Sequence, residues 1–269
     1  MGIAKIEELN KQIIEKARYL GACAAGIADV EALKQSPSHL IYPHTGGYRS
    51  FLNNDVPGDG GEVLWPQYAQ SAIVVAVEHP EDKPELDWWY TGRKGGTPGN
   101  QMLINIIASI TDWLRREKGC KAQGLPYYIA QGGILLKDAA VMAGLGCIGK
   151  NNMLVTPDYG PRVRLRAAFV DIKLPATEPL DFDPCCDCHM PCRTVCPQKA
   201  FQKKVSIANP LNLKMLPARN GAYSRSLCMD QMIIDREHAV VEADENRDDR
   251  LRVAKCCRLC ETSCPVGKK

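Results

Sequence analysis

The chain has 269 residues, of which 45% are hydrophobic and 24% charged, and its formal net charge is +3 at pH 7. This length can form one large domain or two modest ones, and the composition is ordinary for a globular protein. The small net charge gives no argument for a nucleic-acid partner. No stretch reaches the roughly 20 apolar residues of a membrane span, and the first residues show no apolar signal segment. We therefore expect a cytoplasmic protein without a membrane partner.

Hydrophobic periodicity predicts an alternation of helices and strands over about the first 180 residues, which is typical of an α/β (α+β) domain. The expected elements, in chain order, are a helix over 5–20, a buried strand over 71–77, a helix from 103 to near 119, a short strand over 126–130, a helix over 135–143 and a strand over 162–174.

Two segments rich in glycine and proline, 40–67 and 80–99, are expected to be long loops. Loops of this length inside a compact domain are usually functional. The second one carries Trp88, Trp89 and Tyr90. A linker with three prolines at 175–184 separates the two domains that we expect, over 1–180 and 181–269.

Cysteine is the unusual residue type, with 13 in the chain, and most of them fall into two motifs at 185–197 and 256–265. Each motif ends in Cys-x3-Cys-Pro, which is typical of bacterial-type ferredoxins. In ferredoxins with two clusters, the cysteine before the proline binds the other cluster. The pattern predicts two 4Fe–4S clusters, transfer of single electrons at low potential, and an organism that keeps oxygen away, such as an anaerobe.

The second motif is one ligand short, and the isolated Cys228 is the candidate that completes it. The ligands predicted for one cluster are Cys185, Cys188, Cys192 and Cys264. Those predicted for the other are Cys196, Cys228, Cys257 and Cys260. Cys186 and Cys256 remain alternatives to their neighbours.

Zinc and disulfides are the competing interpretations of these cysteines. Zinc sites favour paired Cys-x2–4-Cys knuckles and need neither the Cys-Pro endings nor the repeated x3 spacing. Thiols at metal-ligand spacing, in a chain without a secretory signal, argue against disulfides. Cys23 and Cys120 are expected to be buried small hydrophobes, as is Cys147 unless its glycine-rich surroundings give it a function.

The segment 144–150, Gly-Leu-Gly-Cys-Ile-Gly-Lys, matches the G-x-G-x-x-G pattern of dinucleotide-binding proteins. That fingerprint follows a strand and opens a helix, whereas here a helix is expected before it and a strand-like segment, 152–156, after it. The glycines indicate either a close approach of the backbone to another element or to a flat ligand, or a helix C-cap.

Residues 140–160, taken together with the two cysteine motifs, resemble the core motif of epoxyqueuosine reductases and the related reductive dehalogenases. The resemblance implies a nitroreductase-like domain that holds base-off cobalamin, followed by a ferredoxin-like domain whose clusters feed electrons to the cobalt. It implies that the corrin is lined by Gly144, Gly146, Cys147, Ile148, Gly149, Lys150, Asn151, Tyr159 and Gly160. Residues 88–90 would wall the substrate side.

Several features depart from epoxyqueuosine reductases. The position of the acid in the helix before the turn is Leu136, followed by Lys137, and Asp138 comes two residues later. The chain stops soon after Cys264, without the extension that many of these reductases use on tRNA, and the D-x-H-x-x-G motif is absent. We therefore expect that the protein is not an epoxyqueuosine reductase and that tRNA is an unlikely partner.

The leading hypothesis is a cobalamin-dependent iron–sulfur reductase that acts on a small molecule or on a partner corrinoid protein. One alternative is an electron-transfer protein that reduces a corrinoid or another enzyme without substrate chemistry of its own. Another is a cluster protein whose first domain binds flavin or no cofactor and serves as a docking module. A ferredoxin or flavodoxin is the expected electron donor. No residue is assigned as catalytic, and Lys137, Asp138 and Tyr90 are only candidates.

Overall fold

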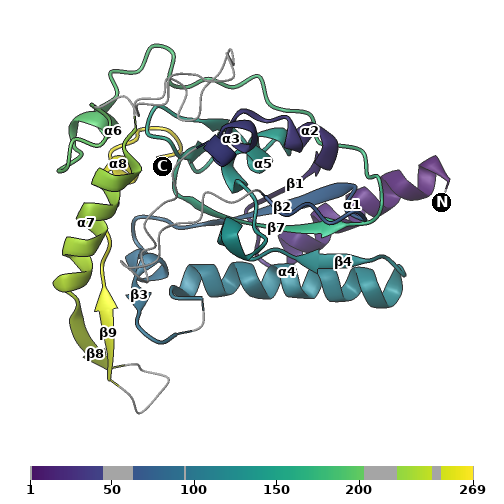
Figure 1. Ribbon diagram of the computed structural model, residues 1–269, viewed down its shortest axis with the longest axis horizontal. Helices are drawn as coiled ribbons and strands as arrows, with labels where there is room; N and C mark the ends of the chain where they lie inside the picture. Colours follow the sequence, from purple (N-terminus) through teal and green to yellow (C-terminus); the bar gives the residue numbers. More distant parts are fainter. Residues whose placement is uncertain (1, 45–62, 94, 203–222, 244–249, 269) are drawn as a thin grey trace.

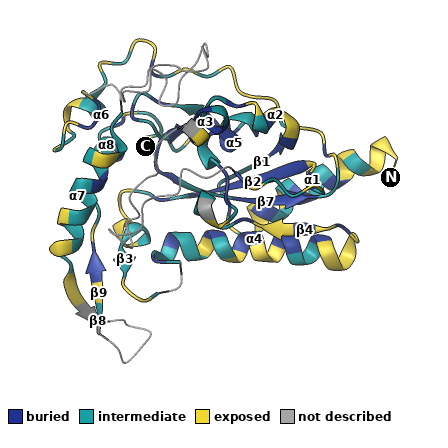
Figure 2. Ribbon diagram, in the orientation of Figure 1, coloured by how far each residue is buried: buried dark blue, intermediate teal, exposed yellow. Residues whose placement is uncertain are grey.

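The computed structural model describes residues 2–44, 63–93, 95–202, 223–243 and 250–268. At its centre lies a four-stranded antiparallel sheet in the order β1-β2-β7-β4 (Figure 1). The strands are β1 (Ala24–Asp29), β2 (Ser71–Glu78), β7 (Val163–Val170) and β4 (Ala122–Gly124). Strand β2 is buried almost throughout (Figure 2), because helices cover both faces of the sheet.

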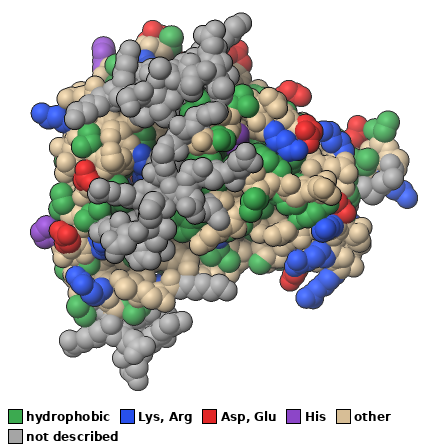
Figure 3. Space-filling view, in the orientation of Figure 1, with side chains coloured by type: hydrophobic (Ala, Val, Ile, Leu, Met, Phe, Trp, Pro, Cys, Tyr) green, Lys and Arg blue, Asp and Glu red, His purple; other side chains and the backbone are tan. Residues whose placement is uncertain are grey.

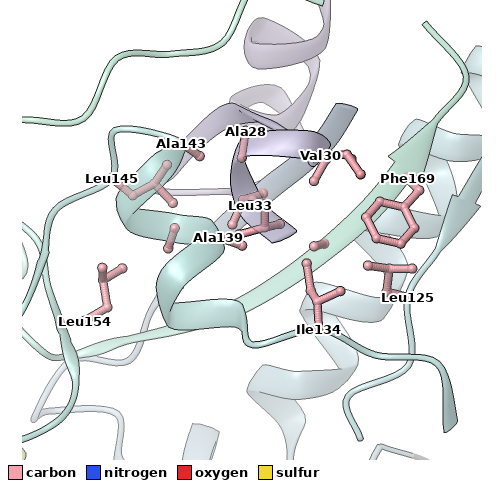
Figure 4. Packing of buried hydrophobic residues seen from close by; sticks show 14 of the residues in the cluster. Ala28, Val30, Leu33, Leu125, Ile134, Ala139, Ala143, Leu145, Leu154 and Phe169 are labelled. Atoms are coloured by element: carbon pink, nitrogen blue, oxygen red, sulfur yellow. The ribbon is translucent and has the colours of Figure 1, made fainter. Parts of the chain in front are cut away.

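Helices α1 (Ile3–Tyr19) and α4 (Pro98–Glu117) cover one face, where Ile73 and Val75 of β2 share a core cluster with Ile13 and Ile110. The short helices α2 (Val30–Lys34), α3 (Pro37–Ile41) and α5 (Leu136–Met142) cover the other face. Figure 4 shows this second cluster, in which Leu33 lies beside Ala139, and Phe169 lies beside Leu125. Apolar side chains alternate between the two faces along β2, so both layers draw on the same strand.

The cysteine-rich part of the chain forms a thinner layer beside the central sheet (Figure 1). Its elements are α6 (Pro191–Thr194), α7 (Arg225–Glu237), β8 (Val240–Ala243), β9 (Arg250–Ala254) and α8 (Leu259–Thr262). Its sheet has the order β3-β9-β8, and β3 (Trp89–Tyr90) comes from the first half of the chain. The two predicted domains therefore share a sheet, and the boundary near residue 180 stays a prediction.

Most of the predicted elements of the first half are confirmed, with shifted ends. Helix α4 begins at Pro98, inside the predicted loop 80–99, because the side chain of Thr97 accepts a hydrogen bond from the Asn100 amide at 3.1 Å and caps it. The same predicted loop also contains the turn η2 (Pro84–Asp87) and strand β3. Most of the other predicted loop, 40–67, lies outside the described residues.

The predicted strand over 126–130 is wrong. Strand β4 pairs with β7 earlier, and the 3-10 turn η3 (Ile129–Gln131) ends at Gly132, which has a φ of +96°. Strands β1, β8 and β9 are among the strands of the described residues that were not predicted. Within the described ranges, no helix has the length and apolar character to cross a bilayer.

Candidate functional site

The cysteines predicted to bind the first cluster lie together. Cys192, on α6, is buried, and its pKa is raised to about 11 by burial and by the neighbouring thiols of Cys264, Cys185 and Cys188. Cys264 comes from the second motif, two residues after the end of α8, and lies near the thiols of the first motif; that it binds the first cluster stays a prediction. Three residues of this set, Cys185, Cys192 and Cys264, are buried.

The cysteines predicted for the second cluster form another group. Burial raises the pKa of Cys260 to about 12, and the nearby thiols of Cys228, Cys257 and Cys196 act in the same direction. Cys228 reaches this group from α7, although it belongs to neither motif. Its place beside the other three supports the inference that it completes the second motif.

The two alternative ligands differ in position. Cys186 is exposed, and its carbonyl oxygen lies 3.4 Å from Lys150 Nζ. Cys256 is partly buried, and its pKa is raised to about 12 by burial, by Asp235 and Asp87, and then by the thiols of the second group. Cys256 therefore stays close enough to the second group to remain an alternative to Cys257, whereas Cys186 points to solvent.

The two groups of thiols fit iron–sulfur clusters in their donor chemistry. In the part of the chain that the structure describes, no three His, Cys, Asp or Glu side chains converge closely enough to hold one metal ion. A tetrahedral zinc site requires such convergence, whereas a 4Fe–4S cluster distributes its four cysteine ligands over a larger body.

The glycine-rich turn after α5 is a helix C-cap. The Gly144 amide donates to Val141 O at 3.0 Å and the Leu145 amide donates to Ala140 O at 2.9 Å, and Gly144 has a φ of +70°. This pattern is the Schellman motif. The chain then enters the hairpin of β5 (Cys147–Ile148) and β6 (Leu154–Val155), so the turn closes a helix, whereas a dinucleotide fingerprint opens one.

The glycines are required because backbone meets backbone. A Cβ at Gly146 would overlap Val155 O, and a Cβ at Gly160 would overlap Val266 O, just after the second cysteine motif. The sequence indicated a close approach of the backbone either to another element or to a flat ligand. The structure shows the approach to another element. Whether a corrin lies against the remaining surface of the turn stays a prediction.

The same turn contacts both cysteine groups. A Cβ at Gly149 would lie 3.6 Å from Cys185 Sγ of the first group. The buried Asn151 donates from Nδ2 to Cys260 O of the second group at 3.4 Å, and its Oδ1 accepts from the Met153 amide at 3.2 Å. Residues 149–151 thus lie between the two predicted clusters.

The candidate proton donors have different surroundings. The buried carboxylate of Asp138 accepts hydrogen bonds from the Ser38 amide at 2.8 Å and the Ser38 hydroxyl at 2.5 Å, so it joins α5 to α3. Lys137 Nζ donates to Asn152 O at 2.7 Å, and burial lowers its pKa to about 8 despite the opposing charge of Asp138. The Lys137 ammonium can therefore release its proton closer to neutral pH than an ordinary lysine does.

The aromatic segment 88–90 packs onto the cysteine-rich part of the chain. Trp89 and Tyr90 pair with Ala254 and Val253 of β9, and Lys255 Nζ lies 4.0 Å from the centroid of the Trp88 ring. These contacts give the segment a structural role at the junction, and its predicted role as a substrate wall stays a prediction.

Sequence reasoning missed a buried cluster of charges near the second motif. Asp87 of η2 and Arg164 of β7 meet Arg258 and Glu261 of the second motif, and His79 lies beside them. Their separations in sequence follow no motif, so no local pattern could have revealed the cluster. Figure 3 shows the outer surface by contrast, where basic and acidic side chains are interspersed.

Comparisons with known proteins agree with this geometry, although no family model matches the chain. The tetrachloroethene reductive dehalogenase of Dehalobacter restrictus is 28% identical over 223 residues, which cover 72% of this chain and 39% of that protein. The epoxyqueuosine reductase of Gloeobacter violaceus is 25% identical over 272 residues, which cover 95% of this chain and 75% of that protein. The chain thus spans well under half of the dehalogenase but most of this epoxyqueuosine reductase.

Solved structures give the same two names. An epoxyqueuosine reductase with an epoxyqueuosine-modified tRNA-Tyr stem loop aligns with a TM-score of 0.61 at 18% identity, covering 97% of this chain and 66% of that one. A catabolic reductive dehalogenase in complex with 3-bromo-4-hydroxybenzoic acid aligns with a TM-score of 0.62 at 19% identity, covering 96% of this chain and 31% of that one. At such identities the likeness shows the fold.

The chain has a mixed α/β fold with paired cysteine motifs, and its relatives in sequence are named as reductases and reductive dehalogenases. The relatives in sequence and the structural neighbours carry the names epoxyqueuosine reductase and reductive dehalogenase, which confirms the resemblance to this group of proteins.

The expectation that tRNA is an unlikely partner is wrong. It is contradicted by the relatives named epoxyqueuosine reductase and by the neighbour solved with a tRNA stem loop. That expectation was based on the net charge and on the last residues of the chain. A net charge averages over the whole surface, and binding of a nucleic acid depends on local groups.

Proposed function

We propose that the chain is a cobalamin-dependent iron–sulfur reductase, with a nitroreductase-like domain over about 1–180 and a ferredoxin-like domain over 181–269. The observation that carries this proposal is the contact of residues 149–151 with both cysteine groups. A redox cofactor bound at this turn would lie next to its electron source, so the path for single electrons would be short.

In this proposal the two groups of four cysteines hold two 4Fe–4S clusters, and the backbone of 144–151 with Tyr159 and Gly160 holds the corrin. When bound, the corrinoid supplies a strongly reducing cobalt centre. Asn151 fixes the distance between the glycine-rich turn and the second cysteine motif. Its buried side-chain amide donates to Cys260 O and accepts from the Met153 amide.

Lys137 is the residue that we propose as proton donor in the absence of an acid at Leu136. Leu136 and Lys137 begin α5, and Lys137 faces Asn152, on the far side of the glycine turn. An ammonium with a pKa of about 8 can release a proton near neutral pH, where an ordinary lysine holds it firmly. A positioned donor typically contributes 10²–10⁴-fold to such a step.

The substrate that the comparisons favour first is the epoxide of epoxyqueuosine in tRNA, because the relatives of that name align along nearly the whole chain. Reductive removal of halogen is the second candidate, favoured by the higher identity of 28% but over less of the chain. Both reactions require low-potential electrons and a proton, and the paired clusters and Lys137 suit either.

The test is a reconstitution under anaerobic conditions with iron, sulfide and cobalamin, followed by reduction with titanium(III) citrate. The reduced protein is given either an epoxyqueuosine-containing tRNA stem loop or tetrachloroethene, and products are identified by mass spectrometry. We expect multiple turnovers on the stem loop. Lys137→Gln should lower the turnover rate about 100-fold. Lys11→Gln, a matched change on the exposed side of α1, should leave the turnover rate unchanged. Stoichiometric zinc, or no bound corrinoid, would refute the proposal.

A further inference from the structure

Four charged side chains form a closed ring beside the second cysteine group. Arg164 lies 2.9 Å from both carboxylate oxygens of Asp87, through Nε and Nη2, and its Nη2 lies 2.7 Å from Glu261 Oε2. Arg258 Nε completes the ring, at 3.1 Å from Asp87 Oδ2 and 3.1 Å from Glu261 Oε1. Each arginine is therefore shared by both carboxylates.

Three of the four side chains of the ring are largely shielded from solvent, and Arg164 is 28% exposed. The side chains of Glu261, Asp87 and Arg258 are 2%, 12% and 13% exposed. Burial acts to raise the pKa of Asp87, but His79, Arg164 and Arg258 outweigh it and hold that pKa below its usual range. The ring contains two arginines and two carboxylates, so their formal charges cancel.

The ring joins the two halves of the chain at the second motif. Arg258 stands in the two-residue stretch between Cys257 and Cys260, and Glu261 directly follows Cys260. Asp87 ends η2 and Arg164 lies on β7, both in the layer of the central sheet. Arg258 also donates to His79 O at 2.6 Å, which anchors the motif on the end of β2.

We propose that this ring sets the reduction potential of the cluster held by Cys196, Cys228, Cys257 and Cys260. The inference rests on the proposed function, which assigns a 4Fe–4S cluster to these residues. Reduction adds one electron to the cluster, and no bond forms or breaks. The potential of such clusters depends on nearby charge, burial and hydrogen bonds. A ring with net positive charge would raise the reduction potential of the cluster, and a ring with net negative charge would lower it. The ring of zero net charge holds the potential between these two values.

The experiment is an EPR-monitored redox titration of the anaerobically reconstituted protein. Arg258→Gln leaves the ring with a net negative charge, so the potential of this cluster should fall. Glu261→Gln leaves it with a net positive charge, so the potential should rise. We expect each change to alter the ratio of reduced to oxidised cluster about tenfold at a fixed potential, which equals about 59 mV for a one-electron couple.

The opposite signs separate this role from a merely structural one, because loosening the motif would shift both variants the same way. Arg258→Lys keeps the charge and should keep the potential near its original value. Two further variants change the ring at residues outside the cysteine motif. Asp87→Asn should raise the potential and Arg164→Gln should lower it. These two variants test the proposal if Arg258→Gln or Glu261→Gln loses iron. The exposed pair Asp112 and Arg115 on α4 supplies the controls, Asp112→Asn and Arg115→Gln.

Equal shifts of both clusters, shifts of one sign, or no shift with full iron content would overturn the inference. A wild-type protein that binds no cluster would instead overturn the proposed function, and iron analysis before the titration tells the two failures apart.

Discussion

Replacing Arg162 with leucine should destabilise the protein by detaching the segment that carries Cys264. The guanidinium is 5% exposed and donates to Cys264 O at 3.1 Å, to Glu261 O at 3.5 Å, and to Val266 O. Leucine would leave these carbonyl groups without their donor, at a cost of about 1–3 kcal/mol for each one that stays buried. Counting the contacts to Cys264 and Val266, we expect a loss of about 4 kcal/mol, or about 8–16 °C in Tm for a chain of this size.

Thermal unfolding of the reconstituted protein, followed by circular dichroism under anaerobic conditions, measures this loss. Arg116→Leu is the matched control, because Arg116 is 80% exposed and lies 3.7 Å from Asp112. That surface pair contributes about 0–1 kcal/mol. If the Arg162 variant has the same Tm as the Arg116 variant, the carbonyl groups have found other donors and the reasoning is refuted.

Three further predictions concern the cofactors and the proton. The protein should bind about eight irons per chain, and Cys264→Ala should remove the EPR signal of the first cluster while Cys196→Ala removes that of the second; about four irons in the unmodified protein would contradict the assignment. Bound cobalamin should give a five-coordinate base-off Co(II) EPR spectrum without nitrogen splitting from a protein histidine, and such splitting would exclude this binding mode. If the Lys137 ammonium donates the proton, the single-turnover rate should fall as the pH rises through about 8, because the ammonium loses its proton there. Lys137→Gln should abolish that fall, and an unchanged pH profile would reject Lys137.

The features that could be predicted from the sequence are those that depend on local spacing. The interlocked cysteine groups follow from the Cys-x3-Cys-Pro endings, and the C-cap at Gly144 follows from an apolar helix that runs into a glycine. Helix α1 and strand β2 follow from hydrophobic patterns of period 3.6 and from β-branched runs.

The features that could not be predicted depend on distant partners. Strand β1 has the sequence Ala-Ala-Gly-Ile-Ala-Asp, with no β-branched run, and it is a strand because it pairs with β2 along its whole length. The ring of Asp87, Arg164, Arg258 and Glu261 joins residues up to 174 positions apart, counted from Asp87 to Glu261. The pairing of residues 89–90 with β9 could not be predicted for the same reason, because that partner strand lies far along the chain.

The interlocked arrangement of the cysteines also has a consequence for biosynthesis. If the ligand groups are as proposed, the second group is complete only when Cys260 has been made and the first only when Cys264 has been made, although the first motif begins at Cys185. Both clusters would then become possible within one short stretch of translation. Until that point the thiols of the first motif would be open to oxidation, so the cell would have to load iron after the last cysteine emerges from the ribosome.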